Sequence, residues 1–296
     1  MDYVSREPSG ALDGVVRSLW FVRGVAGQRQ ERIFPMPFVH VIVNLSGPYR
    51  ATDPVSGAGG PVDGVFCSGL QSHFTVSENP HLVFNLGAVI EPDAVGLLGL
   101  DPAAITGRVG SVEAALPELA RLRDHILAAE DLDTAAGRLL DQRRGEEAGG
   151  LLDQRGGSGG VLLDALDAAL VLSVRDGAPD LVVRSAVAAL AGDPSRSVAS
   201  IATECGLSHK GLIARFRRAT GVTPKFYATL VRFDHLIGGL PLGDDVPWAD
   251  LAVATGYYDQ SHVIRAFKTF TGFTPQDYYR IARLNGPESA RFVPVG

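Results

Sequence analysis

Two groups of basic and amide side chains lie about fifty residues apart, each spaced to line one face of a helix. The first group includes Lys210 and Arg217, and the second includes Gln260, Arg265 and Lys268. Arginine and glutamine can form paired hydrogen bonds with the edges of guanine and adenine. Lysine and arginine near a helix end more often meet backbone phosphates. The chemistry that these residues could carry is recognition of double-stranded DNA.

A repeated pattern predicts the elements that would present these side chains. Residues 201–224 and 251–275 each contain an alanine at the second position, a glycine, and a Thr-Gly-x-Thr-Pro ending. Gly206 and Gly256 tolerate the positive φ that a tight turn between two helices requires. Each repeat therefore predicts a helix-turn-helix unit, in which the small alanine lets the two helices cross closely.

The second helix of each unit has an inward apolar stripe and an outward polar face. Leu212 and Phe216 are four residues apart, as are Val263 and Phe267, so each pair lies on one side of its helix. The opposite side then gives the residues expected at DNA. They are Ser208, His209, Lys210, Ile213, Ala214, Arg217, Arg218, Gln260, Ser261, His262, Arg265 and Lys268.

These outward residues differ in the contacts that they predict. Arg265 and Gln260 have the chemistry for base edges, whereas Arg217, Arg218 and Lys268 lie toward helix C-termini and are expected at phosphates. In the first helix, Ile213 and Ala214 could touch a thymine methyl group or make no contact. A connecting helix over residues 224–237 would span ~21 Å, which with its turns suits units placed one DNA turn apart.

Charge and composition fit a two-part chain. The net charge is −6, divided into +4 for residues 181–285 and −10 for residues 1–180. Such asymmetry is typical of a nucleic-acid module joined to another domain. The chain has two cysteines far apart, no signal-peptide pattern and no apolar run of membrane-spanning length. We therefore expect a cytoplasmic protein with no membrane partner.

The first part of the chain is rich in predicted strands. Residues 15–23, 38–45 and 65–86 alternate or are β-branched, with turn signals between them. Helical spacing follows in residues 93–100, 111–130 and 133–143, with Ser111 as a cap, and an apolar helix over 161–174 could pack on this domain or across a dimer interface.

The resulting fold class is α+β. It comprises a β-rich, barrel-like N-terminal domain with flanking helices, then an all-α domain of two helix-turn-helix units joined by a linker helix. The expected boundaries are 1–143 for the sensor domain, 144–180 for a Gly-rich linker and dimerisation helix, 181–285 for the DNA-binding domain and 286–296 for a tail.

Residues 181–284 resemble the DNA-binding domain of AraC/XylS-family transcriptional regulators. The resemblance rests on residues 197–224 and 248–279, including Gly-Tyr-Tyr-Asp-Gln-Ser-His at 256–262 and Thr-Gly-Phe-Thr-Pro at 271–275. It implies that Lys210, Ile213 and Ala214 lie where the first recognition helix meets bases. It places Gln260, Ser261 and Arg265 at the matching positions of the second helix. The first recognition helix departs from the family pattern, because Ile213 and Ala214 stand where polar residues are often present. We therefore expect the second recognition helix to make the sequence-specific contacts with bases.

The resemblance implies a DNA-binding transcription regulator, with an N-terminal domain that responds to a small-molecule effector or forms a homodimer. Two alternatives remain open, namely a metal-dependent barrel enzyme with a DNA-binding tail and a regulator controlled by a protein partner. His40, His73 and His81 could contribute to a metal site, but their spacing matches no metal motif and favours ordinary histidines. No nucleophile–base pair stands out, so we expect no enzyme activity, no metal and no cofactor.

Overall fold

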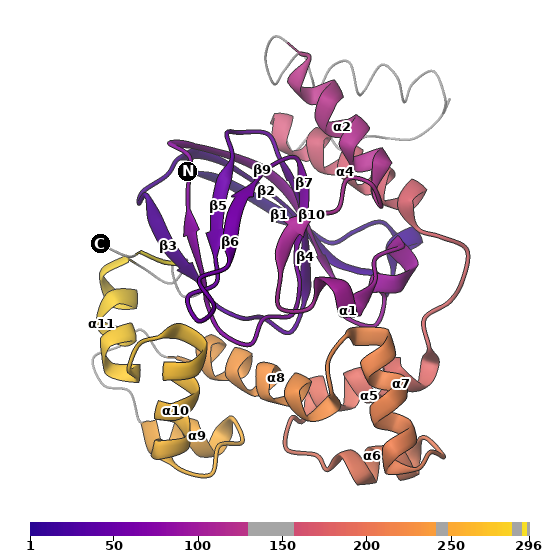
Figure 1. Cartoon of the computed structure of the whole chain (residues 1–296), viewed down its shortest axis with the longest axis vertical. Coiled ribbons are helices and arrows are strands. Elements are labelled where there is room, and N and C mark those ends of the chain that lie inside the picture. Colours follow the sequence, from indigo (N-terminus) through magenta and orange to yellow (C-terminus); the bar gives the residue numbers. More distant parts are fainter. Residues whose placement is uncertain (130–156, 241–247, 286–291, 295–296) are drawn as a thin grey trace.

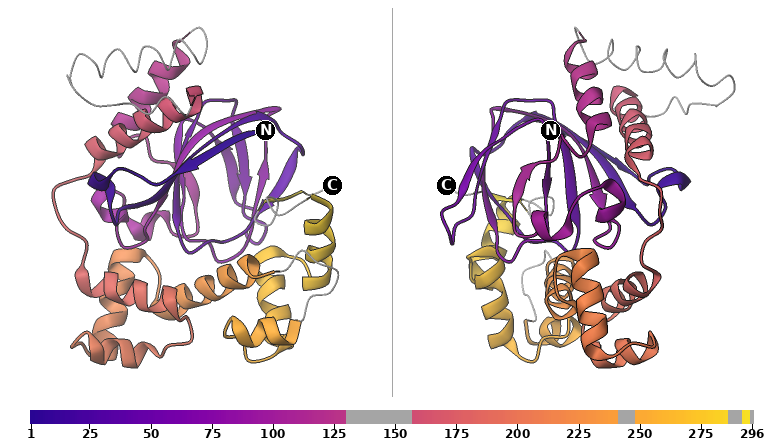
Figure 2. Two further views of the ribbon diagram at one scale, coloured as in Figure 1. Left: turned by 180° about the vertical axis from the view of Figure 1, so that it is seen from behind. Right: turned by 45° about the vertical axis from the view of Figure 1, so that its right-hand side comes forward.

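The molecule consists of a β-rich body with a row of helices along one side of it (Figure 1). This computed structural model describes residues 1–129, 157–240, 248–285 and 292–294. A view from behind and an oblique view show the helical row passing beneath the β-rich body (Figure 2). The predicted mixed class is confirmed, with antiparallel sheets first and helices afterwards.

Two antiparallel sheets make up the β-rich body among the described residues. The first has, in spatial order, β1 (Asp2–Arg6), β2 (Val16–Val25), β9 (Leu82–Ile90), β4 (Val39–Asn44), β7 (Val65–Ser68) and β10 (Val109–Ser111). The second has β11 (Phe292–Pro294), β3 (Gln30–Ile33), β8 (Thr75–Glu78), β5 (Tyr49–Thr52) and β6 (Gly59–Val62).

The two faces of the first sheet contact different partners, as strand alternation requires. Val41 belongs to the main core that the helices cover, whereas its neighbour Ile42 packs in a smaller cluster with Tyr49 and Phe66. Tyr49 comes from the second sheet, and its hydroxyl accepts a hydrogen bond from Asn85 Nδ2 of the first sheet at 2.8 Å. The two sheets therefore face each other.

The predicted β-rich, barrel-like domain is confirmed as two antiparallel sheets, but these sheets do not close into a barrel. The first sheet ends at β1 and β10, and the second ends at β11 and β6, with no ladder joining one sheet to the other in the described residues. β10 and β11 have only three residues each. β6 contains Pro61, which has no N–H to donate to a further strand. The body is thus an open pair of sheets in the part of the chain that the structure describes.

Short helices close the ends of this body, and two longer ones cover its outer face. The short ones are the 3₁₀ helices η1 (Gly10–Leu12) and η2 (Val95–Leu98) and the helix α1 (Pro102–Ile105). The longer ones are α2 (Pro117–Leu127) and α4 (Gly157–Ser173), which pack on each other. Ser111 does not cap a helix as expected, because it ends β10 and the helix begins at a proline six residues later. Residues 133–143, and most of the Gly-rich segment at 144–160, lie outside the described residues.

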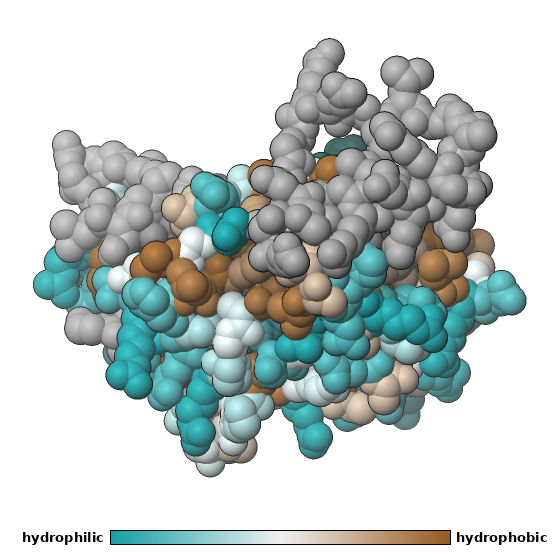
Figure 3. Space-filling model, turned by 90° about the horizontal axis from the view of Figure 1, so that it is seen from above, coloured by the Kyte–Doolittle hydropathy of each residue, from teal (hydrophilic) through white to brown (hydrophobic). Residues whose placement is uncertain are grey.

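The apolar helix that was expected over residues 161–174 packs on the β-rich domain. Leu162, Leu166 and Leu170 of α4 are fully buried in the main core. At the C-terminal ends of α2 and α4, Leu127 and Leu172 are 47% and 73% exposed. Apolar side chains also gather near the middle of the molecule when it is seen from above (Figure 3). None of the described helices has the length and apolarity to span a membrane.

The C-terminal row consists of α5 (Leu181–Gly192), α6 (Val198–Glu204), α7 (His209–Thr220), α8 (Pro224–Gly238), α9 (Trp248–Ala254), α10 (Gln260–Thr271) and α11 (Pro275–Asn285). The predicted caps are confirmed at three N-termini. Ser197 and Ser208 accept backbone hydrogen bonds through Oγ, and Asp259 accepts one from the His262 amide at 2.7 Å.

The chain ends back in the β-rich body. Residues 292–294, which were expected to belong to a tail, form β11 and pair antiparallel with β3, so that Val293 lies opposite Arg32. Val293 is fully buried. β1 lies in the first sheet and β11 in the second, so the first and last described strands belong to the same body.

Candidate nucleic-acid interface

The two repeats form two helix-turn-helix units, α6–α7 and α9–α10. Gly206 and Gly256 adopt φ values of 67° and 78°, as the predicted turns require. Ala202 and Ala252 are fully buried, which is consistent with close helix crossing in each unit. The local structure predicted for each unit is therefore confirmed.

The inward stripe of each second helix is also as predicted. Leu212 and Phe216 of α7, and Val263 and Phe267 of α10, are completely buried. Equivalent residues of the two helices are 51 positions apart, whereas the turn glycines are 50 apart. The second turn thus contains one additional residue, Tyr258.

The twelve residues predicted to contact DNA lie on or next to the outer sides of α7 and α10. Ten of them are exposed, whereas Ile213 and His262 are half-buried. Ser208 is occupied as a cap, because its Oγ accepts a hydrogen bond from the Gly211 amide at 3.1 Å. Ala214 and Arg265 occupy equivalent positions, so only the second helix has a guanidinium there.

Positive charge on these outer faces is available for an external partner. Within the described residues, Lys210, Arg217, Arg218, Arg265 and Lys268 form no ion pair. The other described arginine side chains of the helical row form ion pairs with carboxylates or donate to a backbone carbonyl of the protein itself. One of them, on the other side of α7, pairs with the carboxylate that caps α5. The charge is thus modest in amount but placed on the two exposed helices.

His262 is held in position beside the second recognition helix. Its ring meets Tyr257 edge-on with a centroid distance of 5.0 Å, and its Nδ1 lies 3.5 Å from the Tyr258 amide. Burial lowers the pKa of His262, and the nearby Arg232 and Arg265 lower it further. His262 is therefore neutral near pH 7 and has a packing role in addition to any contact with DNA.

The helix α8 connects the units by contacts on both sides. Leu230, Phe233 and Ile237 are buried, and the Phe233 ring lies 5.5 Å from that of Phe267 in α10. Arg232 donates to the Pro194 carbonyl at 3.0 Å in the first unit, and its guanidinium lies 5.6 Å from the ring centre of Tyr257 in the second. These contacts give the two recognition helices a defined relative position.

Comparisons with known proteins agree with this geometry. Residues 201–281 match the family described as a helix-turn-helix domain. A curated relative from Streptomyces antibioticus, named as an AraC-like transcription regulator, is 36% identical over 104 residues, or 34% of this chain and 34% of that relative. The C-terminal domain is an AraC-type helix-turn-helix domain.

Outside this AraC-type domain the similarities are more distant. Residues 5–110 match a family described as a domain of unknown function, DUF6597. A crystal structure of ToxT from Vibrio cholerae covers 95% of this chain and 98% of that chain, with 11% identity and a TM-score of 0.47. The AraC-like transcriptional activator CuxR covers 80% of this chain and 86% of that chain, with 14% identity and a TM-score of 0.28.

The β-rich body contacts the C-terminal end of each recognition helix in the AraC-type domain. Gly221, which caps α7, lies so close to α1 that an added Cβ would overlap Thr106 Oγ1 and the Pro102 carbonyl. At the matching end of α10, Arg32 Nη1 of β3 donates to the Thr271 carbonyl at 2.9 Å, and an added Cβ at Gly272 would lie 2.6 Å from that nitrogen. The two Thr-Gly-x-Thr-Pro turns, 51 residues apart, thus dock on one body.

Further contacts join the body to the two ends of the AraC-type domain. Arg184 Nε of α5 pairs with Asp93 at 2.9 Å, and the Asp93 side chain is only 2% exposed. At the other end, the Phe34 ring lies 5.6 Å from that of Tyr278 in α11. The core is continuous through these contacts. These contacts between the domains could not be predicted from the sequence, because a local sequence pattern does not indicate which residues 91 or more positions apart will meet.

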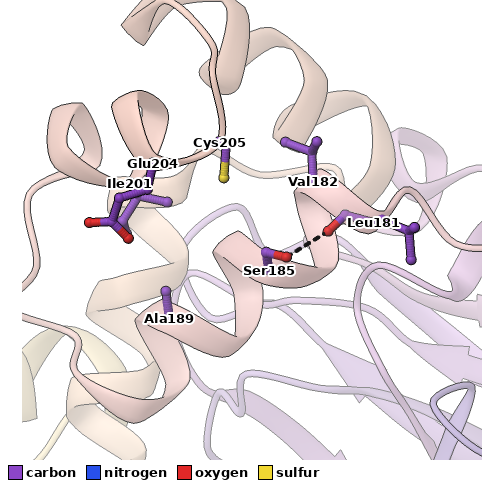
Figure 4. A pocket seen from close by; sticks show the side chains of 7 residues that line it. All are labelled: Leu181, Val182, Ser185, Ala189, Ile201, Glu204 and Cys205. Atoms are coloured by element: carbon purple, nitrogen blue, oxygen red, sulfur yellow. Dashed lines mark hydrogen bonds between the residues drawn. The ribbon is translucent and has the colours of Figure 1, made fainter.

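A pocket opens on the first unit of the AraC-type domain, between α5 and α6 (Figure 4). It has a volume of about 290 Å³, and its walls include Leu181, Ser185, Ile201, Glu204 and Cys205. The Ser185 hydroxyl donates to the Leu181 carbonyl at 2.9 Å, and Glu204 pairs with an arginine. The polar groups at this pocket are therefore already engaged within the protein.

The candidate metal-binding histidines are not gathered into a site. His73 Nε2 lies 3.5 Å from Asp53, but no group of three metal-ligating side chains occurs among the described residues. Burial raises the pKa of the Cys67 thiol to about 12, which makes it a poor nucleophile, and Cys205 is a second free thiol. Nothing in these groups favours the metal-dependent enzyme.

Proposed function

We propose that this chain is a sequence-specific transcription regulator that binds double-stranded DNA through α7 and α10. The observation that carries this proposal is the pair of glycine-hinged units whose exposed faces present cationic side chains with no ion pair among the described residues. The connecting helix α8 defines their relative position, so both helices can serve one duplex. Of the residues at these faces, Arg265 and Gln260 are assigned to base edges, and Arg217, Arg218 and Lys268 to phosphates.

Selection of duplexes from a random library by the full-length protein tests this function. We expect enrichment of one sequence, with affinity at least about a thousandfold above that for unrelated duplex at physiological salt. A matched variant that replaces Arg265 and Lys268 by alanine should lose the enrichment, since both side chains are exposed and neither forms an ion pair in the part of the chain that the structure describes. Binding no stronger than background at low salt would contradict the proposal.

We further propose that the β-rich body regulates DNA binding by holding the ends of both recognition helices. This part of the proposal is supported by two contacts. Thr106 and Pro102 lie against Gly221 in the turn after α7, and Arg32 donates to the Thr271 carbonyl in the turn after α10. An effector in this domain changes DNA affinity only if it binds two arrangements of the domains with different affinity. Arg32→Ala, which removes the hydrogen bond to Thr271, should alter the affinity for the selected duplex, whereas Arg50→Ala on the exposed side of β5 should not.

Association into homodimers is a separate part of the proposal. It is supported by the exposed Leu127 and Leu172, at the C-terminal ends of α2 and α4. Light scattering on the wild-type chain and on Leu172→Ser tests it, with a dimer expected only for the wild type. A monomer in both cases would contradict this part and leave DNA binding unaffected.

A further inference from the structure

Tyr258 is an exposed aromatic residue in the turn that leads into α10, the second helix of the second unit. It precedes Asp259, the N-cap of α10, and 90% of its side chain is exposed. Among the large apolar and aromatic side chains that the structure describes, none is more exposed. Its hydroxyl has no hydrogen-bond partner within the described residues, and only its backbone amide is engaged, with His262 Nδ1. Folding therefore gives no reason for an aromatic ring at this position.

The first unit has no counterpart of this residue. The turn there runs from Gly206 through Leu207 to the cap Ser208, whereas the second turn has two tyrosines before its cap. Tyr257 takes the inward role, because it is 4% exposed and packs against His262. Tyr258 is thus the added residue, and its ring points away from the packed turn.

We propose that Tyr258 contacts the DNA backbone, with its hydroxyl donating a hydrogen bond to a phosphate oxygen beside the groove that α10 enters. In helix-turn-helix proteins the N-terminal residues of the recognition helix approach the bases, so the residue just before the helix lies near the groove edge. Tyrosine hydroxyls are among the groups that bind phosphate in this way. This inference rests on the proposed DNA binding and adds a specific anchor to the second unit alone.

A neutral phosphate contact has a signature that distinguishes it from the cationic ones. Lysine or arginine at a phosphate releases counterions, so its removal reduces the dependence of the binding constant on salt. A phenol releases none. Loss of the Tyr258 hydroxyl should therefore weaken binding without changing the slope of log K against log salt. The weakening should also be the same for every duplex, because phosphates carry no sequence information.

The test uses the full-length protein, the Tyr258→Phe variant and the duplex that the wild type selects. We expect about tenfold weaker binding, the loss of one hydrogen bond to a charged group, on both the selected and a scrambled duplex. The salt slope and the thermal unfolding midpoint should be unchanged, since the hydroxyl has no partner in the described protein. Tyr3→Phe is the matched control, because Tyr3 is a 63% exposed tyrosine on β1, far from the units in sequence and fold, and it should bind as the wild type does.

Each other outcome decides against the inference in a different way. Equal affinity of the wild type and Tyr258→Phe would overturn the contact and leave the proposed function intact. Weakening on the selected duplex alone would assign Tyr258 to base reading and overturn the backbone contact. Absence of DNA binding by the wild type would overturn both the proposed function and this inference.

Discussion

Replacement of Arg265 by alanine tests the reading of bases by the second recognition helix. Arg265 is exposed on α10, forms no ion pair among the described residues and has Ala214 as its equivalent on α7. Arg265→Ala thus gives the second helix the side chain that the first already has. Because no intramolecular bond of this side chain is lost, the free energy of unfolding should change by less than about 0.5 kcal/mol.

The expected cost to binding follows from the paired hydrogen bonds that a guanidinium makes with guanine. Loss of such a pair removes ~1–3 kcal/mol of discrimination at one base pair. At ~1.4 kcal/mol for each factor of ten, this corresponds to about 5- to 150-fold weaker binding to the selected duplex. On a duplex changed at that base pair alone, the wild type and the variant should bind almost equally.

Fluorescence anisotropy with single-base variants of the selected duplex would measure this effect. Arg265→Lys is the informative control, because it keeps the charge but loses the planar fork, and it should lose most of the discrimination. Equal weakening of Arg265→Ala on every duplex, with full recovery in Arg265→Lys, would show a phosphate contact. That result would refute the assignment of Arg265 to a base.

Three further predictions concern charge, docking and stability. Lys268→Ala should lower the slope of log K against log salt by about one, measured by anisotropy at several salt concentrations. Gly221→Ala and Gly206→Ala should each cost ~1–2 kcal/mol for the left-handed backbone. Only Gly221 also faces the β-rich body, so its variant should unfold at a clearly lower urea concentration, and equal midpoints would argue against the docking. Arg184→Ala should destabilise the chain by about 2 kcal/mol, because it leaves the buried carboxylate of Asp93 unpaired. Adding Asp93→Asn should recover part of that loss in the same urea titration, and no recovery would mean that the ion pair is not the cause.

The helix-turn-helix units could be predicted because their determinants are local. Gly206 and Gly256 mark the turns, Ser208 and Asp259 mark the helix starts, and apolar residues four apart mark the buried side. Each of these signals acts within one or two helical turns of the chain. The outward positions followed from the same periodicity, although their contacts with DNA remain predictions.

The arrangement of the domains could not be predicted in the same way. The hydrogen bond from Arg32 to Thr271 joins residues 239 positions apart, and β11 pairs with β3 across most of the chain. Nothing in a three-residue strand near the C-terminus distinguishes it from a loop. Whether the two sheets close into a barrel could not be predicted for a related reason, because closure depends on which edges meet and not on how many strands a segment contains. Tyr258 was also missed, although the change from a 50-residue to a 51-residue spacing marks it.

The return of the chain to β3 gives the helical row two fixed ends. One end leaves the β-rich body through α4, and the other re-enters it through β11, so the row is a bridge and not a pendant arm. A domain attached at one end could rotate away from the β-rich body about a single hinge. A domain attached at both ends can only bend between its attachments unless one of them detaches. Any large reorientation on a duplex therefore requires one of these two attachments to detach, together with the contacts that dock the turns after α7 and α10 on the β-rich body.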